Sequence, residues 1–406
     1  MSAKVRPTES RPVVAVIFGT RPEAIKLVPV ARELQLHADS LKTVVISTGQ
    51  HREMLDQVIG PFNIRVDHDM SLMESGQSLY KLSSKTILAF ENVLKTFKPD
   101  FLLVQGDTTT AFIGAFASGY AKIPVGHVEA GLRTNNKYFP FPEEINRRLI
   151  SVMADLHFAP TDGSRQNLIR EGVPDDRIFV TGNTAIDTLL AVLDLKRKVL
   201  AKLPAFDSKR LVLVTVHRRE VFGEAMRDIF YALRDLANAV PDLLIYFPVH
   251  LNPNVRKPAQ EILGTSPNII LAEPLDYFDF VHVMSRADLI LTDSGGIQEE
   301  APTLGKPVLV LRGQTERPEG LATGLVQLVG TERRSIVESA LRALNSDARM
   351  KQGGRINPYG DGKAAARIVK EILHFLALPH GGAYDEIGAF QPMEQTAVSQ
   401  IMVKRN

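Results

Sequence analysis

Short runs of apolar residues alternate with longer segments of helical period along most of the chain. In the first half, five such runs predict buried strands, at 13–18, 43–47, 101–105, 123–128 and 156–159. The segments between them fit helices, and Pro22 is well placed at the first position of a helix over residues 22–36. Nearly continuous apolar strands separated by helices predict a parallel sheet that is covered on both faces.

The same alternation begins again after about residue 187. Five further runs predict strands at 211–216, 243–248, 268–271, 289–291 and 308–311. The Lys- and Leu-rich segment 189–210, broken by Pro204, is interpreted as the connection between two domains. We therefore predict an α/β protein with two doubly wound Rossmann-like domains facing a cleft, in a GT-B-like arrangement. The predicted domains are residues 1–187 and 188–378, followed by a tail at 379–406, and a last helix at about 363–377 could pack back on the first domain.

Polar clusters follow several predicted strands, where open α/β sheets bind their ligands. After the first strand the chain turns at Gly19 into a helix, which places Arg21 and Lys26 near free backbone N–H groups. This pattern fits a phosphate site, although the spacing is not that of a Walker A loop. A structural turn with a surface arginine explains the same residues equally well.

Three carboxylates follow the later strands of the first half. Asp107 and Glu129 come directly after neighbouring predicted strands, and Glu143 lies in the first turn of the helix that follows Pro142. Carboxylates held close together can have different pKa values and act as acid and base. Alternatively, Asp107 caps the helix that starts near Thr109, and the first-turn acids Glu143 and Glu144 only complement the helix dipole.

His127 precedes one of these carboxylates and could in principle ligate a metal together with Glu129. The sequence has no second His, Asp or Glu pair at ligand spacing to complete such a site. A hydrogen-bonded core histidine is therefore the favoured interpretation.

The second half has two comparable clusters. The strand at 211–216 runs into His217 and Arg218, which suggests a cationic group facing phosphate, although a solvated strand end is the alternative. His250 follows the next strand and fits a ligand contact or a turn histidine equally well.

A serine and two glycines follow the strand at 289–291. Ser294, Gly295 and Gly296 lead into a helix, a pattern that lets the backbone approach a pyrophosphate. Glu299 or Glu300, one turn later, could accept from ribose hydroxyls, and Arg317 adds a cation beyond the following strand.

Composition excludes several other classes of function. The formal net charge is +2, too small for a nucleic-acid partner or a charged membrane surface, and the absence of cysteine excludes disulfides and thiolate chemistry. The polar N-terminus lacks the apolar run of a signal peptide, and no apolar stretch reaches membrane-spanning length. We expect a cytoplasmic, soluble protein.

These clusters together resemble the non-hydrolysing bacterial UDP-N-acetylglucosamine 2-epimerases, over residues 18 to about 377. The matching signatures lie at 18–26, 106–110, 126–134, 142–148, 182–187, 217–220, 293–300, 315–319 and 357–364. Many long motifs in the correct order make the resemblance specific.

The resemblance implies a homodimeric isomerase that acts on a UDP-N-acetylhexosamine, with no cofactor and no metal. Its reaction eliminates UDP to give 2-acetamidoglucal and adds UDP again with inversion at carbon two. The motifs match Asp107, Glu129, Glu143 and His217 to the catalytic residues, but do not settle which carboxylate takes the proton from carbon two. The implied UDP contacts are Arg21, Lys26, Phe280, Ser294, Gly295, Gly296, Glu300 and Arg317.

Some members of the family also bind the substrate at an allosteric site. Gln50, Arg218 and His250 match parts of that site, whereas Glu53 and Gly76 depart from it. The resemblance therefore does not imply strong activation by substrate.

Four other functions remain open on the sequence. The nearest is a sister epimerase that acts on a modified sugar, such as a UDP-diacetamido-uronic acid, and the second is a hydrolysing relative that releases N-acetylmannosamine. The third is a GT-B glycosyltransferase, which would need fewer acids than the three found here. The fourth, a non-enzymatic nucleotide-sugar sensor, is disfavoured because all four matched catalytic residues are present.

Overall fold

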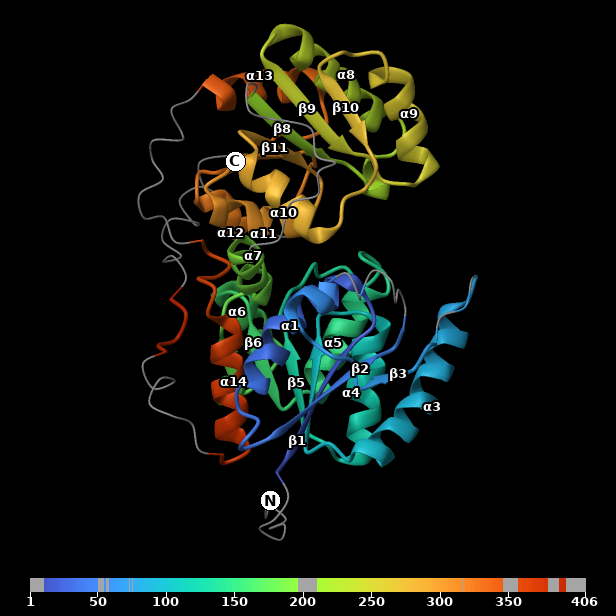
Figure 1. Ribbon diagram of the computed structural model, residues 1–406, viewed down its shortest axis with the longest axis vertical. Helices are drawn as coiled ribbons and strands as arrows, with labels where there is room; N and C mark the ends of the chain where they lie inside the picture. The colour runs from blue at the N-terminus through green and yellow to red at the C-terminus, as the bar shows by residue number, and fades with distance from the viewer. Residues whose placement is uncertain are drawn as a thin grey trace. The chain divides into compact units, whose positions relative to one another are not determined.

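The computed structural model describes residues 11–49, 55, 58–72, 74, 76–195, 210–315, 317–345, 357–378 and 387–391. These residues form two compact units (Figure 1). The first contains the described residues up to Thr188 and those from Gly360 to Gln391, and the second contains those from Leu189 to Tyr359.

The first unit is built on a seven-stranded sheet in the order β3-β2-β1-β4-β5-β6-β7, in which every pair of neighbours is parallel. Its strands are β1 Val13–Phe18, β2 Lys42–Ser47, β3 His68–Asp69, β4 Phe101–Gln105, β5 Val125–Val128, β6 Leu156–Ala159 and β7 Ile178–Val180. Its helices are α1 Arg21–Gln35, α3 Leu79–Phe97, α4 Thr109–Ala121, α5 Glu143–Met153, α6 Asp162–Arg170 and α14 Ala364–Phe375, with short 3-10 helices η1 Gly60–Phe62 and η2 Asp175–Arg177. Helix α7, Thr184–Asp194, begins in this unit.

Both faces of this sheet carry helices. Strand residues such as Ala15 and Ile17 share one apolar core with Phe90 of α3 and Ile150 of α5, so that α3, α4 and α5 cover this face. Helix α14, from the far end of the described sequence, packs beside α1 (Figure 1).

The second unit is built on a six-stranded parallel sheet in the order β10-β9-β8-β11-β12-β13. Its strands are β8 Arg210–Thr215, β9 Leu243–Pro248, β10 Ile269–Ala272, β11 Leu289–Thr292, β12 Val308–Val310 and β13 Val326–Leu328. Its helices are α8 Glu224–Ala239, α9 Pro253–Leu263, α10 Tyr277–Arg286, α11 Gly295–Glu300, α12 Pro318–Ala322 and α13 Arg333–Asn345, with 3-10 helices η3 Arg219–Val221 and η4 Ala301–Leu304. Residues of α8, α9 and α13 share one core with the strands.

The predicted α/β class is confirmed, and the predicted strands lie close to the observed ones. The strand expected at 123–128 begins only at Val125, because the Ile123 N–H closes the end of α4 by donating to the Ser118 carbonyl. The short edge strands β3, β7 and β13 were not predicted, because two or three residues are too few to show a strand period. Residues 196–209 of the expected connection lie outside the described residues, as do 379–386 and 392–406 of the expected tail.

The strand order fixes where each sheet can bind a ligand. In the first sheet the order reverses between β1 and β4, and in the second between β8 and β11. The crevice at the carboxyl ends of such a strand pair is where doubly wound sheets bind their ligands. Each of the four strands leads directly into one of the polar clusters predicted from the sequence.

Candidate active site

The loop after β1 is tied to the loop after β4 by one buried carboxylate. Glu23, in the first turn of α1, accepts from the backbone N–H groups of Gly19 at 3.1 Å and Thr20 at 2.7 Å. Its other oxygen accepts from the Thr108 hydroxyl at 2.6 Å. Burial raises the pKa of Glu23, and these hydrogen bonds oppose that shift. Glu23 thereby joins the segment that carries Arg21 to the segment that carries Asp107.

Gly19 lies close to the side chains of Thr48, after β2, and Thr110, in the first turn of α4. A Cβ atom on Gly19 would lie 2.3 Å from the Thr48 hydroxyl oxygen and 2.6 Å from that of Thr110. The glycine seen in the sequence therefore serves packing between the strand-end loops, in addition to any role in ligand binding.

Glu129 is held by three donors directly after β5. Its carboxylate accepts from Lys26 Nζ and Gln105 Nε2, and from Asn183 Nδ2 at 3.4 Å. The backbone of Glu129 has φ of 65°, in the left-handed region that side chains other than glycine rarely occupy. Such strain at a carboxylate among specific donors is typical of a functional position. Lys26, which the resemblance assigns to UDP, is paired with Glu129 here.

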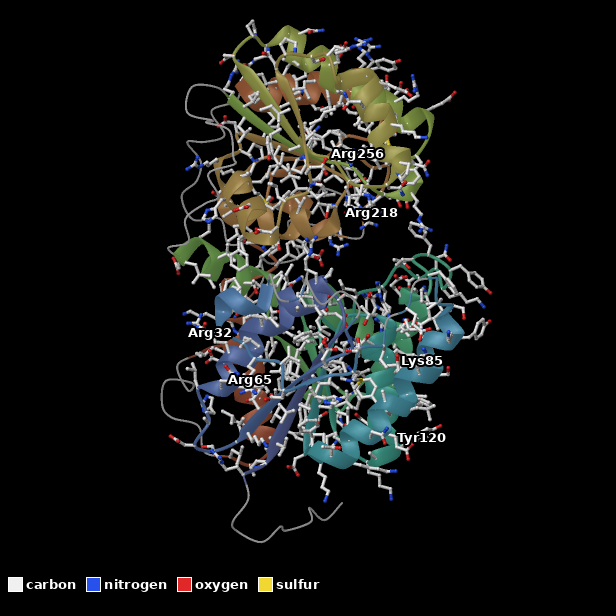
Figure 2. The ribbon with its side chains drawn as sticks, turned by 45° about the vertical axis from the view of Figure 1, so that its right-hand side comes forward. Arg32, Arg65, Lys85, Tyr120, Arg218 and Arg256 are labelled. Atoms are coloured by element: carbon white, nitrogen blue, oxygen red, sulfur yellow. The ribbon has the colours of Figure 1, made fainter. Side chains whose placement is uncertain are left out.

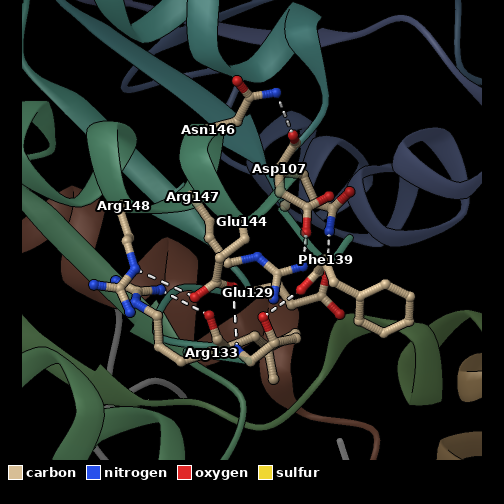
Figure 3. Close-up of polar contacts among 12 residues, drawn as sticks. Asp107, Glu129, Arg133, Phe139, Glu144, Asn146, Arg147 and Arg148 are labelled. Atoms are coloured by element: carbon tan, nitrogen blue, oxygen red, sulfur yellow. Dashed lines mark hydrogen bonds and ion pairs between the residues drawn. The ribbon is translucent and has the colours of Figure 1, made fainter. Parts of the chain in front are cut away.

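Asp107 does not cap the helix that follows it. The side chain of Thr108 caps α4 by accepting from the Ala111 N–H at 3.0 Å, so the alternative interpretation of Asp107 as a cap is wrong. The Asp107 carboxylate instead pairs with Arg147, and the backbone carbonyl of Asp107 accepts from the Asn146 side chain at 2.8 Å (Figure 3). Both partners lie on α5, so the strand-end acid is fixed by the neighbouring helix.

The two first-turn acids of α5 have different environments. Glu144 is fully buried and accepts from the N–H groups of Thr134 and Asn135, from Arg147 and from Arg148 (Figure 3). For Glu143, the oxygen Oε2 is buried and has no hydrogen-bond partner among the described residues. Glu144 is therefore the structural acid, whereas Glu143 has an oxygen available for chemistry.

His217 follows β8 in the second unit and lies against a buried carboxylate after β11. Its Nδ1 atom is 3.2 Å from Asp293 Oδ1, and its ring stacks on His250 with centroids 5.8 Å apart. Burial lowers the pKa of His217; the Asp293 charge raises it, and His250 and Arg218 lower it further.

The Ser294 loop and Arg317 form a second cluster in this unit. Ser294 stands at the N-cap of α11, but its side chain makes no capping hydrogen bond. Arg317 Nε donates to Glu299 at 2.7 Å, and both side chains are largely buried. A Cβ atom on Gly295 would lie 2.5 Å from Arg317 Cζ, so only glycine lets the guanidinium rest against the start of α11.

Glu300 and Phe280 lie on different helices of the second unit, α11 and α10. Glu300 accepts from the buried Tyr277 hydroxyl at 3.0 Å, and Phe280 is partly buried on α10. Glu299, for which the sequence suggests a ribose contact, is paired with Arg317.

Comparison with known proteins identifies the family. A family model described as UDP-N-acetylglucosamine 2-epimerase matches residues 33–373. The chain belongs to this family.

Curated members of the epimerase family cover almost the whole chain. A "Probable UDP-N-acetylglucosamine 2-epimerase" from Ralstonia solanacearum is 52% identical over 373 residues, which is 90% of this chain and 99% of that protein. A "UDP-N-acetylglucosamine 2-epimerase" from Escherichia coli K12 is 50% identical over 368 residues, 88% of this chain and 98% of that protein.

Solved structures agree with this assignment. The crystal structure of the Neisseria meningitidis UDP-GlcNAc 2-epimerase bound to UDP-GlcNAc is 48% identical, with a TM-score of 0.83, over 89% of this chain and 100% of that chain. A glycotransferase of kitacinnamycin, 12% identical with a TM-score of 0.60 over 89% of this chain, shares the fold alone. The resemblance seen in the sequence is confirmed, and the chain is an enzyme of the epimerase family.

The remaining histidines and allosteric candidates of this epimerase-family chain lie in different surroundings. His127 is buried and shares a 2.7 Å hydrogen bond with the Gly106 carbonyl, as expected of a core histidine, and burial lowers its pKa to about 3. His250 is exposed, and its Nδ1 accepts from the Asn252 N–H at 3.1 Å, which fits a turn histidine. Arg218, labelled in Figure 2, follows β8, and Gln50 lies outside the described residues.

No group of three or more His, Cys, Asp or Glu side chains among the described residues is arranged to hold a metal ion. Within the same residues, no helix is both long and apolar enough to cross a membrane.

Proposed function

We propose that the protein interconverts UDP-N-acetylglucosamine and UDP-N-acetylmannosamine by inverting carbon two of the sugar. The observation that supports this most strongly is the set of three carboxylates of the first unit, Asp107, Glu129 and Glu143, in a chain of the epimerase family. Asp107 and Glu129 follow the adjacent strands β4 and β5. Glu143 begins α5, the helix whose Asn146 donates to the Asp107 backbone carbonyl. An epimerase must remove a proton and return one to the opposite face, which needs more than one acid–base group.

In the proposed reaction a carboxylate removes the proton from carbon two, and the electron pair forms the carbon one–carbon two double bond of 2-acetamidoglucal. The bond from carbon one to the phosphate oxygen breaks, and UDP leaves with the electron pair. UDP then adds back to carbon one while carbon two receives a proton on its other face. Atoms and electrons balance without an outside oxidant or reductant.

The second unit supplies the groups suited to the leaving diphosphate. We propose that His217, Arg317 and the Ser294–Gly296 loop stabilise its growing negative charge, which is the largest electrostatic change in the elimination. Arg21, Lys26, Phe280 and Glu300 stay predictions as further UDP contacts. Support for the loop comes from the Ser294 side chain, which makes no capping hydrogen bond to α11, and from the close approach of Arg317 to Gly295.

Proton NMR in deuterated water tests the proposal directly. Purified protein with UDP-N-acetylglucosamine should produce UDP-N-acetylmannosamine that carries deuterium at carbon two. Free N-acetylmannosamine would instead indicate the hydrolysing reaction. If UDP bound and no product formed, the substrate would be a modified UDP-sugar or the reaction an acceptor-dependent transfer.

Amide variants test the roles of the proposed catalytic groups. The variants Asp107→Asn, Glu129→Gln, Glu143→Gln and His217→Asn should each reduce turnover and leave UDP binding largely intact. Loss of binding with unchanged turnover per bound substrate would contradict these roles.

We further propose that the protein is a homodimer. Large apolar side chains of α3, α4 and α5 are exposed, among them Tyr80 at 89%, Leu88 at 63%, Tyr120 at 76% and Val152 at 84%. Exposed apolar surface concentrated on neighbouring helices is typical of a protein–protein interface. Light scattering coupled to size exclusion should give twice the mass of the chain, and a monomer at micromolar concentration would refute it.

A further inference from the structure

Asp293 is a buried carboxylate at the point where the strand order of the second sheet reverses. It directly follows β11 and has no exposed surface. Its Oδ2 atom accepts from the backbone N–H groups of His217 at 2.7 Å and Arg218 at 2.8 Å, directly after the adjacent strand β8. A buried charge is costly unless it receives hydrogen bonds, and these two bonds also fix the turn on which His217 stands.

The other oxygen of Asp293 faces the His217 ring. Asp293 Oδ1 is 3.2 Å from His217 Nδ1, yet the two are not aligned for a hydrogen bond, and Oδ1 has no hydrogen-bond donor among the described residues. The torsion that turns an imidazole ring has a broad energy well. A small rotation of the ring therefore brings an Nδ1–H group onto Oδ1 and satisfies the buried oxygen.

We propose that Asp293 is a positioning residue for His217 in the reaction proposed above. It holds the proton on Nδ1, so that Nε2 is the ring nitrogen presented to the substrate. It also stabilises the imidazolium form of His217, whose Nε2 takes a proton from solvent as the substrate diphosphate binds and then donates to the leaving diphosphate. This inference rests on the proposed function and adds to it the residue through which His217 is oriented.

The other charged groups around the ring act against the imidazolium form. Arg218 precedes η3 on the same segment, and His250 stacks on the ring from the end of β9. Both lower the pKa of His217, as burial does, whereas Asp293 raises it. Among these groups Asp293 is the one that favours protonation, so its removal should shift the protonation of His217 to lower pH.

The variant Asp293→Asn separates positioning from a merely structural role. Its amide oxygen can still accept the two backbone N–H groups, which keeps the turn after β8. Its amide NH₂ group then faces Nδ1 and donates to it, which forces the proton onto Nε2 and gives the opposite tautomer. The same replacement in a Ser-His-Asp triad keeps the geometry and lowers turnover through the wrong tautomer.

Asp288→Asn is the matched control. Asp288 lies at the other end of the same strand junction, where its Oδ2 accepts from the Leu211 N–H of β8 at 2.7 Å. Like Asp293, Asp288 joins β11 to β8 because its side chain accepts from a backbone N–H group. Asp288 precedes β11, whereas Asp293 follows it. A loss shared by both variants would reflect the sheet junction alone.

The experiment measures kcat and KM against pH for the full chain and four variants: Asp293→Asn, Asp288→Asn, His217→Asn and the double variant of 217 and 293. We expect Asp293→Asn to lower kcat by about 100-fold or more, to shift the basic limb of the kcat profile to lower pH because His217 acts in its protonated form, and to change KM by less than about 3-fold. The double variant should be no slower than His217→Asn. Unchanged kcat and pH profile, additive losses in the double variant, or an equal loss in Asp288→Asn would overturn the proposal.

A nitrogen-15 NMR measurement of the His217 ring tests the inference independently of activity. The resonance is assigned by its loss in His217→Asn, and the free protein at neutral pH should have the proton on Nδ1. A proton on Nε2 in the unsubstituted protein would refute the positioning role, even if Asp293→Asn did not fold. If the protein does not epimerise but the Nδ1 tautomer is found, the proposed function fails while the pairing of Asp293 with His217 stands.

Discussion

Glu144 offers a sharp test of how the loop before α5 is held. Its buried carboxylate accepts from the N–H groups of Thr134 and Asn135, both at 3.1 Å, and from Arg147 at 3.3 Å and Arg148 at 3.2 Å. The isosteric variant Glu144→Gln removes the charge and turns one of the two acceptor oxygens into a donor. Two of the four donors, one backbone N–H and one arginine, then face an NH₂ group and lose their partner.

The size of the effect follows from these contacts. A hydrogen bond to a charged group contributes about 1.5–3 kcal/mol, and the Arg148 contact is discounted because that side chain is 42% exposed. Loss of one or two of the better-buried bonds gives about 2–4 kcal/mol for opening of the loop. Since about 1.4 kcal/mol corresponds to a factor of ten, amide protection at Thr134 and Asn135 should fall by roughly 30- to 1,000-fold.

Hydrogen exchange with mass spectrometry on the full chain measures this directly. The control is Glu91→Gln, which removes an exposed ion pair with Lys95 on α3 and should leave exchange at residues 134 and 135 unchanged. Turnover should also fall in Glu144→Gln, because Arg147 binds both Glu144 and Asp107. Unaltered protection at 134 and 135 in Glu144→Gln would refute the view that this carboxylate holds the loop.

Three further outcomes follow from the described contacts. Gly295→Ala should displace Arg317 and weaken UDP binding by about 10-fold or more in calorimetry, whereas Gly313→Ala, whose added Cβ meets nothing within 4 Å, should bind normally. Burial raises the pKa of Asp187 to about 7, so its protonated form stabilises the fold below about pH 4, and this contribution is lost as pH rises to 7. The melting temperature of the unsubstituted protein, relative to that of Asp187→Asn, should therefore fall between about pH 4 and pH 7. A constant difference between the two melting temperatures would contradict the shift. The pKa of His127 is lowered to about 3, so the buried neutral imidazole stabilises the fold fully above about pH 6.5 and less as pH falls. His127→Gln should therefore lose less melting temperature on acidification than the unsubstituted protein. Parallel plots of melting temperature against pH would contradict this.

Much of the candidate site could be predicted because its motifs are local. A strand that ends in Gly, Ser, Asp or His and runs into a helix is visible as a change of period followed by polar residues. Asp107, Glu129, His217 and Ser294 were all found in this way, and the structure places each one directly after a strand. The resemblance then rested on the order of these motifs, which is also a property of the sequence.

The residues that hold these groups could not be predicted in the same way. Glu23 is 85 positions from Thr108, and Asp293 is 76 positions from His217, so no local pattern relates them. Glu144 is the partial exception, because arginines three and four positions later are a helical pairing signal. That signal did not show that the carboxylate is buried and also accepts from the backbone at 134 and 135.

By itself, then, the sequence determined the class of fold, the longer strands of each sheet and the polar residues at their carboxyl ends, because apolar period and turn chemistry are set by neighbours along the chain. Only the tertiary structure decided that β1 lies beside β4 and β8 beside β11, strands that are not consecutive in the chain. Those pairings bring the distant Thr108 hydroxyl to the buried carboxylate of Glu23, and the distant His217 N–H to that of Asp293. The order of the strands decides which donors lie within hydrogen-bond distance of a buried carboxylate, and that order is not written in any local stretch of the sequence.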